Sequence, residues 1–267
     1  MTNCKSVVAM LKKASLVGAF FLLLACSNHT AASFCSIKNT PPEFAVRNVV
    51  DGDTLRLQDN RRVRLVGIDA PEMGGRGRTT EPYAVKATQR LTALVKANHN
   101  KVGLRIAEQS HDRYGRVLAH LYNRDGASLE EQLVAEGLAY HVVIAPNTAL
   151  AGCLAQAEQS ARQQRLGLWA TASYLPAQKL TQGGFTLLQG RIRQVQRNRG
   201  GVWLELGYSV TVNIPLSALQ YFNDEKFEQW QGRTVKTRGW VTERKGQQNK
   251  YAKWRLTVSH PSMLELQ

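Results

Sequence analysis

Three short clusters of acidic and basic residues carry the side chains that could do chemistry. They are residues 51–54 (DGDT), 64–72 (RLVGIDAPE) and 112–116 (DRYGR). Asp53 lies in a turn between expected strands, and Asp69 comes just after a strand end, so a barrel could bring both carboxylates to one rim. Two carboxylates with a backbone carbonyl and waters form a hard oxygen site that suits calcium. Such a site is open enough to accept a phosphate oxygen.

The same clusters supply a candidate base and two cations. Glu72 follows Asp69 by three residues across a proline, which places it to act as a general base on a water. Arg64 and Arg116 carry forked guanidinium groups that match phosphate oxygens and can stabilise a transition state more negative than the ground state. These are the parts of a metal-assisted phosphodiester hydrolase. Each cluster alone reads as a polar turn or a solvated strand, so the hypothesis depends on all three occurring in order.

The surrounding pattern predicts the elements that position these clusters. Strands are expected at 44–50, 54–57, 62–68, 102–106 and 117–121. Helices are expected from about Thr80, from the capping box of Ser128 and Glu131, and from about Asn147 to Arg165. Five strands with one helix after the third and two at the end follow the order of an OB-fold barrel. The predicted class is mainly β with helices (α+β), with a five-stranded OB-fold barrel and three helices over residues 44–170.

A second pattern of strands follows a segment without periodicity at 171–183, which we interpret as a linker. Five more strands and a short amphipathic segment predict a second, smaller OB-like barrel over 184–267. This region holds 13 Lys and Arg against 6 Asp and Glu. Its aromatic residues lie among these cations, and an OB barrel of that kind can bind single strands by charge and stacking. The alternative is that the aromatic residues belong to the core. The accessory region is therefore a hypothetical nucleic-acid-binding module.

The first 25 residues have the pattern of an export signal. Three lysines precede an uncharged, mostly apolar run at 14–25 that would span about 18 Å as a helix, too short for the ~30 Å bilayer core. The run ends in LLAC, which is similar to a bacterial lipoprotein signal with Cys26 as the lipidated residue. Ordinary cleavage near Ala32 is the alternative. With Cys26 as the first residue after processing, residues 1–25 would be removed, and 26–43 would form an N-terminal arm.

The remaining cysteines and the net charge indicate the cell compartment and the partners of the protein. If Cys26 is lipidated, Cys35 and Cys153 remain, and two thiols in an exported chain are a candidate disulfide; unpaired thiols are the alternative. The formal net charge of +15 favours polyanionic partners, either nucleic acid or an anionic membrane surface. We therefore expect a cell-envelope lipoprotein or a periplasmic or secreted protein.

Taken together, the three clusters closely resemble the motifs of the staphylococcal nuclease (thermonuclease) family. The closing signature of that family, at 161–162 (AR) and 166–169 (LGLW), is also present, so the resemblance covers roughly residues 44–169. It implies a monomeric, calcium-dependent nuclease that cuts DNA and RNA, with single strands favoured, and leaves 3′-phosphates. A non-catalytic module that only binds nucleic acid is the alternative, and an envelope lipoprotein that uses its barrels for protein contacts is a third hypothesis.

The resemblance assigns roles residue by residue. The catalytic residues that it implies are Arg64, Glu72 and Arg116. The calcium ligands that it implies are Asp53, Asp69 and the carbonyl of Ala70. The resemblance also implies that Arg113 and Tyr114 contact a terminal phosphate of the substrate.

One departure concerns base stacking. Two tyrosines that the family pattern places after the second helix are replaced by Val142 and Ile144, and Tyr140 or His141 could cover part of their role. The catalytic pattern is not affected by this change.

Overall fold

The computed structural model describes residues 35–75, 77, 79–223, 225–244 and 252–267. The predicted signal peptide, the lipidation site Cys26 and the first part of the arm lie outside these residues. No helix within the described part of the chain is long and apolar enough to cross a membrane. Both barrels described below belong to the same compact unit, residues 33–267.

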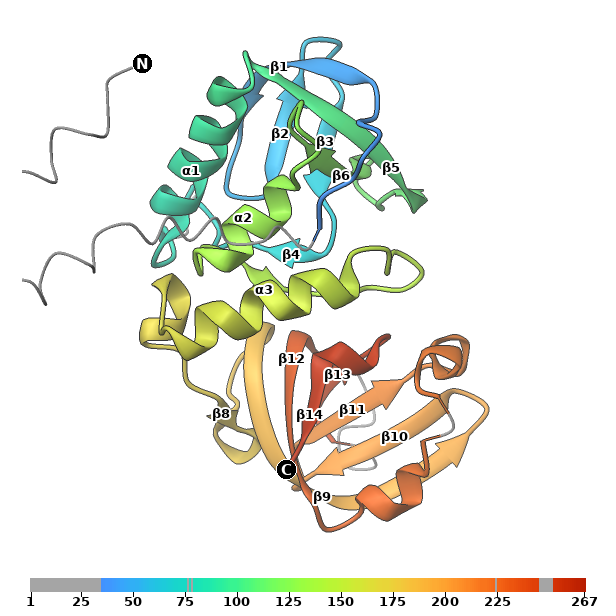
Figure 1. Cartoon of the computed structure of the whole chain (residues 1–267). Helices are drawn as coiled ribbons and strands as arrows, with labels where there is room; N and C mark the ends of the chain where they lie inside the picture. The colour runs from blue at the N-terminus through green and yellow to red at the C-terminus, as the bar shows by residue number, and fades with distance from the viewer. Residues whose placement is uncertain (1–34, 76, 78, 224, 245–251) are drawn as a thin grey trace, which may run out of the picture. The chain divides into compact units, whose positions relative to one another are not determined.

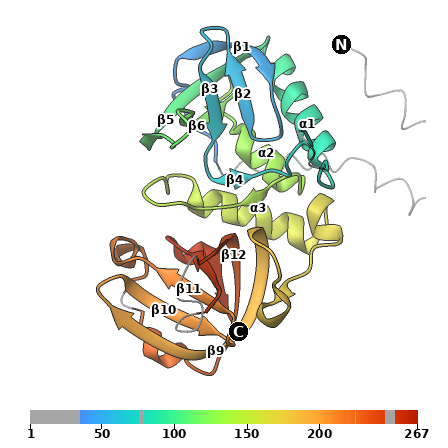
Figure 2. The same cartoon turned by 180° about the vertical axis from the view of Figure 1, so that it is seen from behind.

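The first barrel is built from five strands and closes on itself (Figures 1 and 2). The strands are β1 (Glu43–Val49), β2 (Thr54–Leu57), β3 (Arg62–Leu65), β5 (Lys101–His111) and β6 (Val117–Tyr122). Their order is β1-β2-β3-β6-β5, with β3 and β6 parallel and β5 paired back to β1. Alternate residues such as Leu55, Leu57, Val63 and Leu65 are buried inside. The mainly β fold with an OB-like barrel is therefore confirmed.

Three α-helices of the described chain lie in this first half: α1 (Ala84–Ala97), α2 (Leu129–Ala135) and α3 (Ala151–Gln163). The predicted cap of α2 is present, since the Ser128 side chain accepts from the Glu131 N–H. The first helix begins later than Thr80 because Tyr83, with a φ of 69°, is in the left-handed region and cannot continue a right-handed helix. The apolar side of α1 packs on the barrel core.

The predicted strand at 62–68 is interrupted. Gly67 has a φ of 87°, so the chain turns after β3 and starts a separate strand, β4 (Ile68–Asp69). The partner of β4 is β7 (Tyr140–His141), and together they form a small two-stranded antiparallel sheet. Asp69 is thereby carried on its own ribbon beside the barrel.

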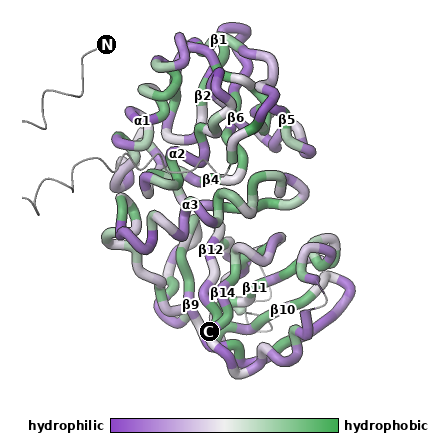
Figure 3. The backbone as a smooth tube through the Cα atoms, viewed as in Figure 1, coloured by the Kyte–Doolittle hydropathy of each residue, from purple (hydrophilic) through white to green (hydrophobic). Residues whose placement is uncertain are grey.

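The second half repeats the strand order of the first. Its strands are β9 (Gly184–Asn198), β10 (Gly201–Leu206), β11 (Val210–Ile214), β12 (Thr234–Glu243) and β13 (Trp254–Thr257). They pair as β9-β10-β11-β13-β12, and β12 pairs back to β9. The β11–β13 pair is parallel, as β3–β6 is in the first barrel. Hydrophobic residues recur along β10 and β11 (Figure 3), and their buried side chains belong to a second core.

The segment between the two barrels is partly packed against the second core. Residues 171–183, assigned to a linker from the sequence, contain β8 (Leu175–Pro176) and the 3-10 helix η3 (Ala177–Lys179). Ala177 and Leu180 are buried in the second core. The same core includes Val142, Val143 and Ala151 from the first half. The domain boundaries stay predictions, but the two halves share one apolar interface.

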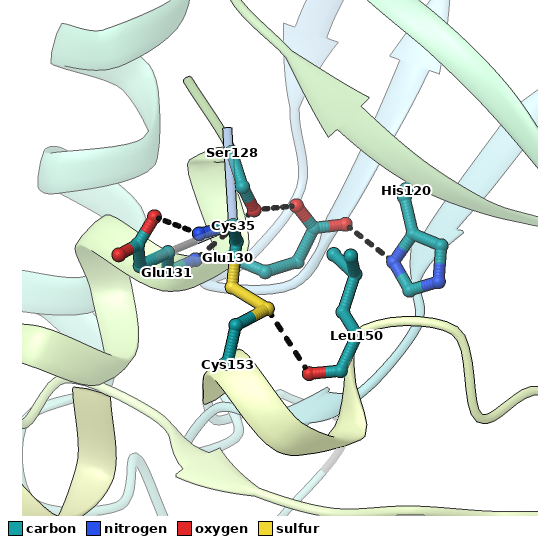
Figure 4. The surroundings of a disulfide bond; sticks show 7 residues. All are labelled: Cys35, His120, Ser128, Glu130, Glu131, Leu150 and Cys153. Atoms are coloured by element: carbon teal, nitrogen blue, oxygen red, sulfur yellow. Dashed lines mark hydrogen bonds and ion pairs between the residues drawn. A yellow bond between two sulfur atoms is a disulfide. The ribbon is translucent and has the colours of Figure 1, made fainter. Parts of the chain in front are cut away.

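A disulfide joins Cys35 of the N-terminal arm to Cys153 of α3 (Figure 4). The Cys35 N–H also donates to the Glu131 carboxylate at 3.2 Å, which fixes the arm to the start of α2. Beside it, the buried Glu130 accepts from the Ser128 hydroxyl at 2.8 Å. The bridge spans 118 residues of sequence.

Candidate active site

The turn between β1 and β2 positions Asp53. Its backbone N–H donates to Asp51 Oδ1 at 3.0 Å, which shapes the turn, and its own carboxylate is buried. A Cβ at Gly52 would lie 2.6 Å from the Cβ atoms of both Ala70 and Ala87, so only glycine fits here. This close approach brings Asp53 to the chain after β4, where the Ala70 N–H donates to Asp53 Oδ2 at 2.8 Å. The DGDT turn is therefore more than a hairpin connection.

Arg64 joins the two acidic residues. Its Nη2 lies 3.0 Å from Asp53 Oδ2 and 2.9 Å from Asp69 Oδ1. Its Nη1 donates to the carbonyl oxygens of Leu65 at 2.6 Å and Ile68 at 2.9 Å. The guanidinium thus fixes the turn that separates β3 from β4. In this structure Arg64 faces the two carboxylates and backbone rather than open solvent.

The electrostatics of the carboxylate pair favour a bound cation. Burial raises the pKa of Asp53, and the charge of Asp51 adds to the effect, while Arg64 opposes it. Burial raises the pKa of Asp69 as well, again against Arg64, with Asp53, Glu72 and Glu81 adding negative charge. A divalent cation at these oxygens would offset the excess negative charge. The predicted ligand set of two carboxylates and a carbonyl therefore fits a hard cation chemically.

Within the described residues no three His, Cys, Asp or Glu side chains gather as in a closed metal centre. The candidate site has only two such side chains, and its remaining oxygen donors would be the Ala70 carbonyl and water. An open site of this kind leaves positions for a substrate oxygen.

Glu72 lies at the edge of this pair on an exposed loop. Its backbone N–H donates to Glu81 Oε2 at 2.9 Å, and the Glu81 N–H donates to the Glu72 carbonyl at 3.1 Å. These two bonds fix the ends of the loop and leave the Glu72 side chain open to solvent. Its charge acts on both Asp69 and Arg64. A base in this position can reach a water beside the carboxylate pair.

The third cluster forms the turn from β5 to β6, where Asp112 orients Arg116. The Arg116 Nε donates to Asp112 Oδ2 at 2.7 Å, and the Tyr114 and Arg116 N–H groups both donate to Asp112 Oδ1 at 2.9 Å. Partial burial tends to raise the pKa of Asp112, but these bonds outweigh it, so the pKa lies below its usual value. Asp112 therefore stays ionised and holds Arg116 in one orientation.

Strand pairing places the turn that carries Arg116 next to the strand that carries Arg64. In the parallel β3–β6 pair, Arg64 is opposite Leu118, and Arg116 lies two residues before Leu118, just ahead of β6. Arg64 alternates with the buried Val63 and Leu65, so it belongs to the outer face of the barrel. The neighbouring Arg113 donates to the Tyr114 hydroxyl at 2.6 Å, and Tyr114 is 65% exposed. The predicted substrate contacts thus occupy an exposed turn at the same edge.

The structure brings Asp53, Arg64, Asp69 and Ala70 into direct contact. Three further residues had no role in the hypothesis: Asp51 and Glu81 act on the acidic pair by charge, and Asp112 orients Arg116. Asp51 and Asp112 belong to the recognised motifs, so their place in those motifs could have identified them as residues of the site. Nothing in the sequence marked Glu81, because its importance depends on the fold of the 72–81 loop.

The region expected to stack on bases also differs from the family pattern. Val142 is buried, and Ile144 is exposed. His141 is fully buried and faces the protein interior, so it cannot contact a substrate. Tyr140 is half-buried and pairs with Asp69 across the β4–β7 ribbon. Of the two replacements considered, only Tyr140 remains.

The fold and the site define an OB-type barrel with an acidic pair, a candidate base and two arginines at one edge. Residues 62–171 match the family model described as "Staphylococcal nuclease homologue". The chain is 36% identical over 138 residues to the SPbeta prophage-derived endonuclease YokF of Bacillus subtilis, covering 50% of this chain and 46% of that one. It is 34% identical over 131 residues to Endonuclease YncB of the same organism, covering 47% and 61%.

A thermonuclease of Staphylococcus intermedius is 32% identical over 129 residues, covering 47% of this chain and 75% of that one. The chain belongs to the staphylococcal nuclease family. It spans about half the length of the prophage endonuclease and less than two thirds of Endonuclease YncB. The matched residues 62–171 contain every candidate catalytic, metal-binding and substrate-binding residue except Asp53, which precedes them.

Proposed function

We propose that this protein is a calcium-dependent nuclease that hydrolyses phosphodiester bonds in DNA and RNA and leaves 3′-phosphates. The observation that carries the proposal is the contact of Arg64 with both Asp53 and Asp69, at 3.0 and 2.9 Å. It gathers the predicted metal ligands and one catalytic arginine at a single point. Relatives named as endonucleases and a thermonuclease support the same reaction class.

Asp53, Asp69 and the Ala70 carbonyl would hold the calcium ion. When bound, the ion would supply positive charge to a phosphate oxygen and to a water near it. Glu72 accepts a proton from that water as the water oxygen bonds to phosphorus. The bond from phosphorus to the 5′-oxygen breaks, and the leaving 5′-oxygen takes up a proton from solvent. Arg116, already oriented by Asp112, donates to the phosphate oxygens as negative charge develops. Arg64 Nη1 keeps its two carbonyl contacts, while Nη2 exchanges a carboxylate oxygen for a phosphate oxygen.

We also propose an exported location, with a lipid anchor at Cys26 or, after cleavage near Ala32, a periplasmic or secreted protein. The apolar run at 14–25 and the LLAC sequence support this location. Metabolic labelling with a fatty acid, compared between wild type and Cys26→Ser, tests the anchor. Equal labelling of both proteins, or of neither, would remove it from the proposal.

The hydrolysis of single-stranded DNA tests the main proposal. Purified protein is assayed with calcium and with chelator, alongside Glu72→Gln, Arg116→Ala and the control Glu228→Gln, which changes an exposed glutamate of the second barrel. We expect calcium-dependent cleavage that either site substitution lowers by about a hundredfold or more, since a general base contributes ~10²–10⁴-fold. The control should retain wild-type activity. Binding without cleavage in any metal would instead favour the non-catalytic module.

A further inference from the structure

Four aromatic rings form a contact series that runs from the first barrel to the second. Trp169 meets the edge of Tyr140 with ring centroids 5.2 Å apart, and Tyr140 stacks on Phe185 at 5.3 Å with planes 29° apart. Phe185 in turn meets Trp240 at 5.3 Å. Trp240, the outermost ring, is 40% exposed, and the other three are half-buried. Tyr140 and Phe185 also pack against the second core, and the series opens to solvent at Trp240.

The second ring of the series, Tyr140, lies next to the acidic pair. Tyr140 is the antiparallel partner of Asp69 in the β4–β7 ribbon. Directly opposed residues project to the same face, with Cβ atoms about 4.5–5.5 Å apart. The Tyr140 ring therefore starts on the side of the ribbon that carries the Asp69 carboxylate. A nucleic-acid strand with one phosphate at Asp69 would have its next bases beside this ring.

The series ends on the second barrel, which is fixed in place. Phe185 on β9 and Trp240 on β12 are register partners, so their contact is built into the sheet. Two residues from Trp240, Arg238 pairs with both carboxylate oxygens of Glu158 on α3, at 2.6 and 2.7 Å. Glu158 also accepts from the His141 N–H next to Tyr140, at 2.8 Å. Glu158 thus links the segment of Tyr140 to the strand of Trp240.

We infer that Tyr140, Phe185 and Trp240 form an extended binding track for single-stranded nucleic acid, leading from the acidic pair onto the second barrel. The inference rests on the proposed function and adds a subsite that the first barrel alone does not contain. Unpaired bases have free faces and edges for aromatic contacts, whereas duplex bases are already stacked. The excess of 13 basic over 6 acidic residues in 184–267 would attract the phosphates of that strand.

The test compares long and short ligands. Binding of fluorescent single-stranded 20-mers and of dinucleotides is measured by anisotropy in the Glu72→Gln background with calcium, so that cleavage does not consume the ligand. Trp240→Ala and Phe185→Leu are compared with Tyr208→Ala, which removes a ring that is 83% exposed on the β10–β11 turn, outside the series. Thermal melting of each variant reports on folding.

We expect Trp240→Ala to raise the ratio of the 20-mer Kd to the dinucleotide Kd by about 5- to 150-fold, the range for one lost base–aromatic contact. Phe185→Leu should raise the ratio less, and Tyr208→Ala should leave it within twofold. An unchanged ratio in Trp240→Ala, or an equal rise in Tyr208→Ala, would overturn the inference. If wild type proves unable to cleave but the Trp240 effect on binding persists, the proposed hydrolysis fails and the track stands.

Discussion

Arg238 on β12 and Glu158 on α3 form a buried ion pair, and its loss should destabilise the whole protein. The two side chains are 5% and 4% exposed, and Arg238 Nη1 contacts both carboxylate oxygens. Replacing Arg238 by Met leaves the Glu158 carboxylate buried with only the His141 N–H and the more distant Arg162 Nε, at 3.5 Å, as partners. Removing one member of a buried pair costs about 3–5 kcal/mol.

For a chain of this size, each 1 kcal/mol lowers the melting temperature by about 2–4 °C. We therefore expect Arg238→Met to melt about 6–20 °C below wild type in circular dichroism or differential scanning calorimetry. Arg255→Met, which changes an exposed arginine on β13, should change stability by less than about 0.5 kcal/mol. The double variant Arg238→Met with Glu158→Met removes both charges and should recover most of the loss.

The same scan tests whether the barrels unfold together. Because Glu158 belongs to the first barrel's helix and Arg238 to the second barrel, loss of the pair should shift one common transition. If the melting temperatures of Arg238→Met and Arg255→Met differ by less than 2 °C, the predicted cost of leaving Glu158 buried without its cation is refuted. Two separate transitions, of which only one moves, would refute the coupling of the barrels.

Three further outcomes follow from local features. Reduction of the disulfide, or Cys153→Ser, should lower the free energy of unfolding in urea by up to about 5 kcal/mol, since the bridge closes 118 residues; a change below 1 kcal/mol would contradict this. Gly52→Ala inserts a methyl group between two alanine Cβ atoms, which should cost about 1–3 kcal/mol and displace Asp53. Calcium-dependent cleavage should therefore fall more than in the control Gly75→Ala, where a Cβ would have open space. Burial lowers the pKa of His141 to about 3, with Arg238 and other cations adding to the effect, and neither ring nitrogen has a hydrogen-bond partner among the described residues. The unfolded chain therefore binds a proton on His141 that the native state does not. The free energy of unfolding should be unaffected by this group above pH ~6.5 and should fall by about 1.4 kcal/mol per pH unit as pH falls toward 3. His141→Leu should make the free energy of unfolding less dependent on pH in this range, and an unchanged dependence would refute the assignment.

The sequence predicts the local contacts within the three clusters better than it predicts the contacts between the two halves of the protein. The three clusters are local in sequence, and each keeps its internal contacts, as Asp112 and Arg116 show. The start of α1 and the break after β3 were missed because single left-handed residues, Tyr83 and Gly67, decide them. Nothing local marks either conformation, since tyrosine rarely adopts it and glycine adopts positive and negative φ about equally readily.

Pairings between distant segments could not be foreseen. Glu158 has the spacing of an ordinary helix residue, and its partner Arg238 comes 80 residues later in a strand. Val142 aligns with a family position near the substrate, yet it belongs to the core shared with the second barrel. A sequence pattern shows which side of a strand is apolar, but not which other element will cover it.

The position of β7 argues that the second barrel supports the site as well as extending it. One edge of β7 pairs with β4, which carries Asp69, and the His141 N–H contacts the carboxylate that Arg238 holds. Truncation after Gln182 would expose the shared apolar core and leave Glu158 without its cation, so β7 would lose its support. A truncated chain should then lose activity on dinucleotides as well as on long strands. For that reason a substitution such as Trp240→Ala, which leaves the ion pair intact, can separate nucleic-acid binding from support of the site, and truncation cannot.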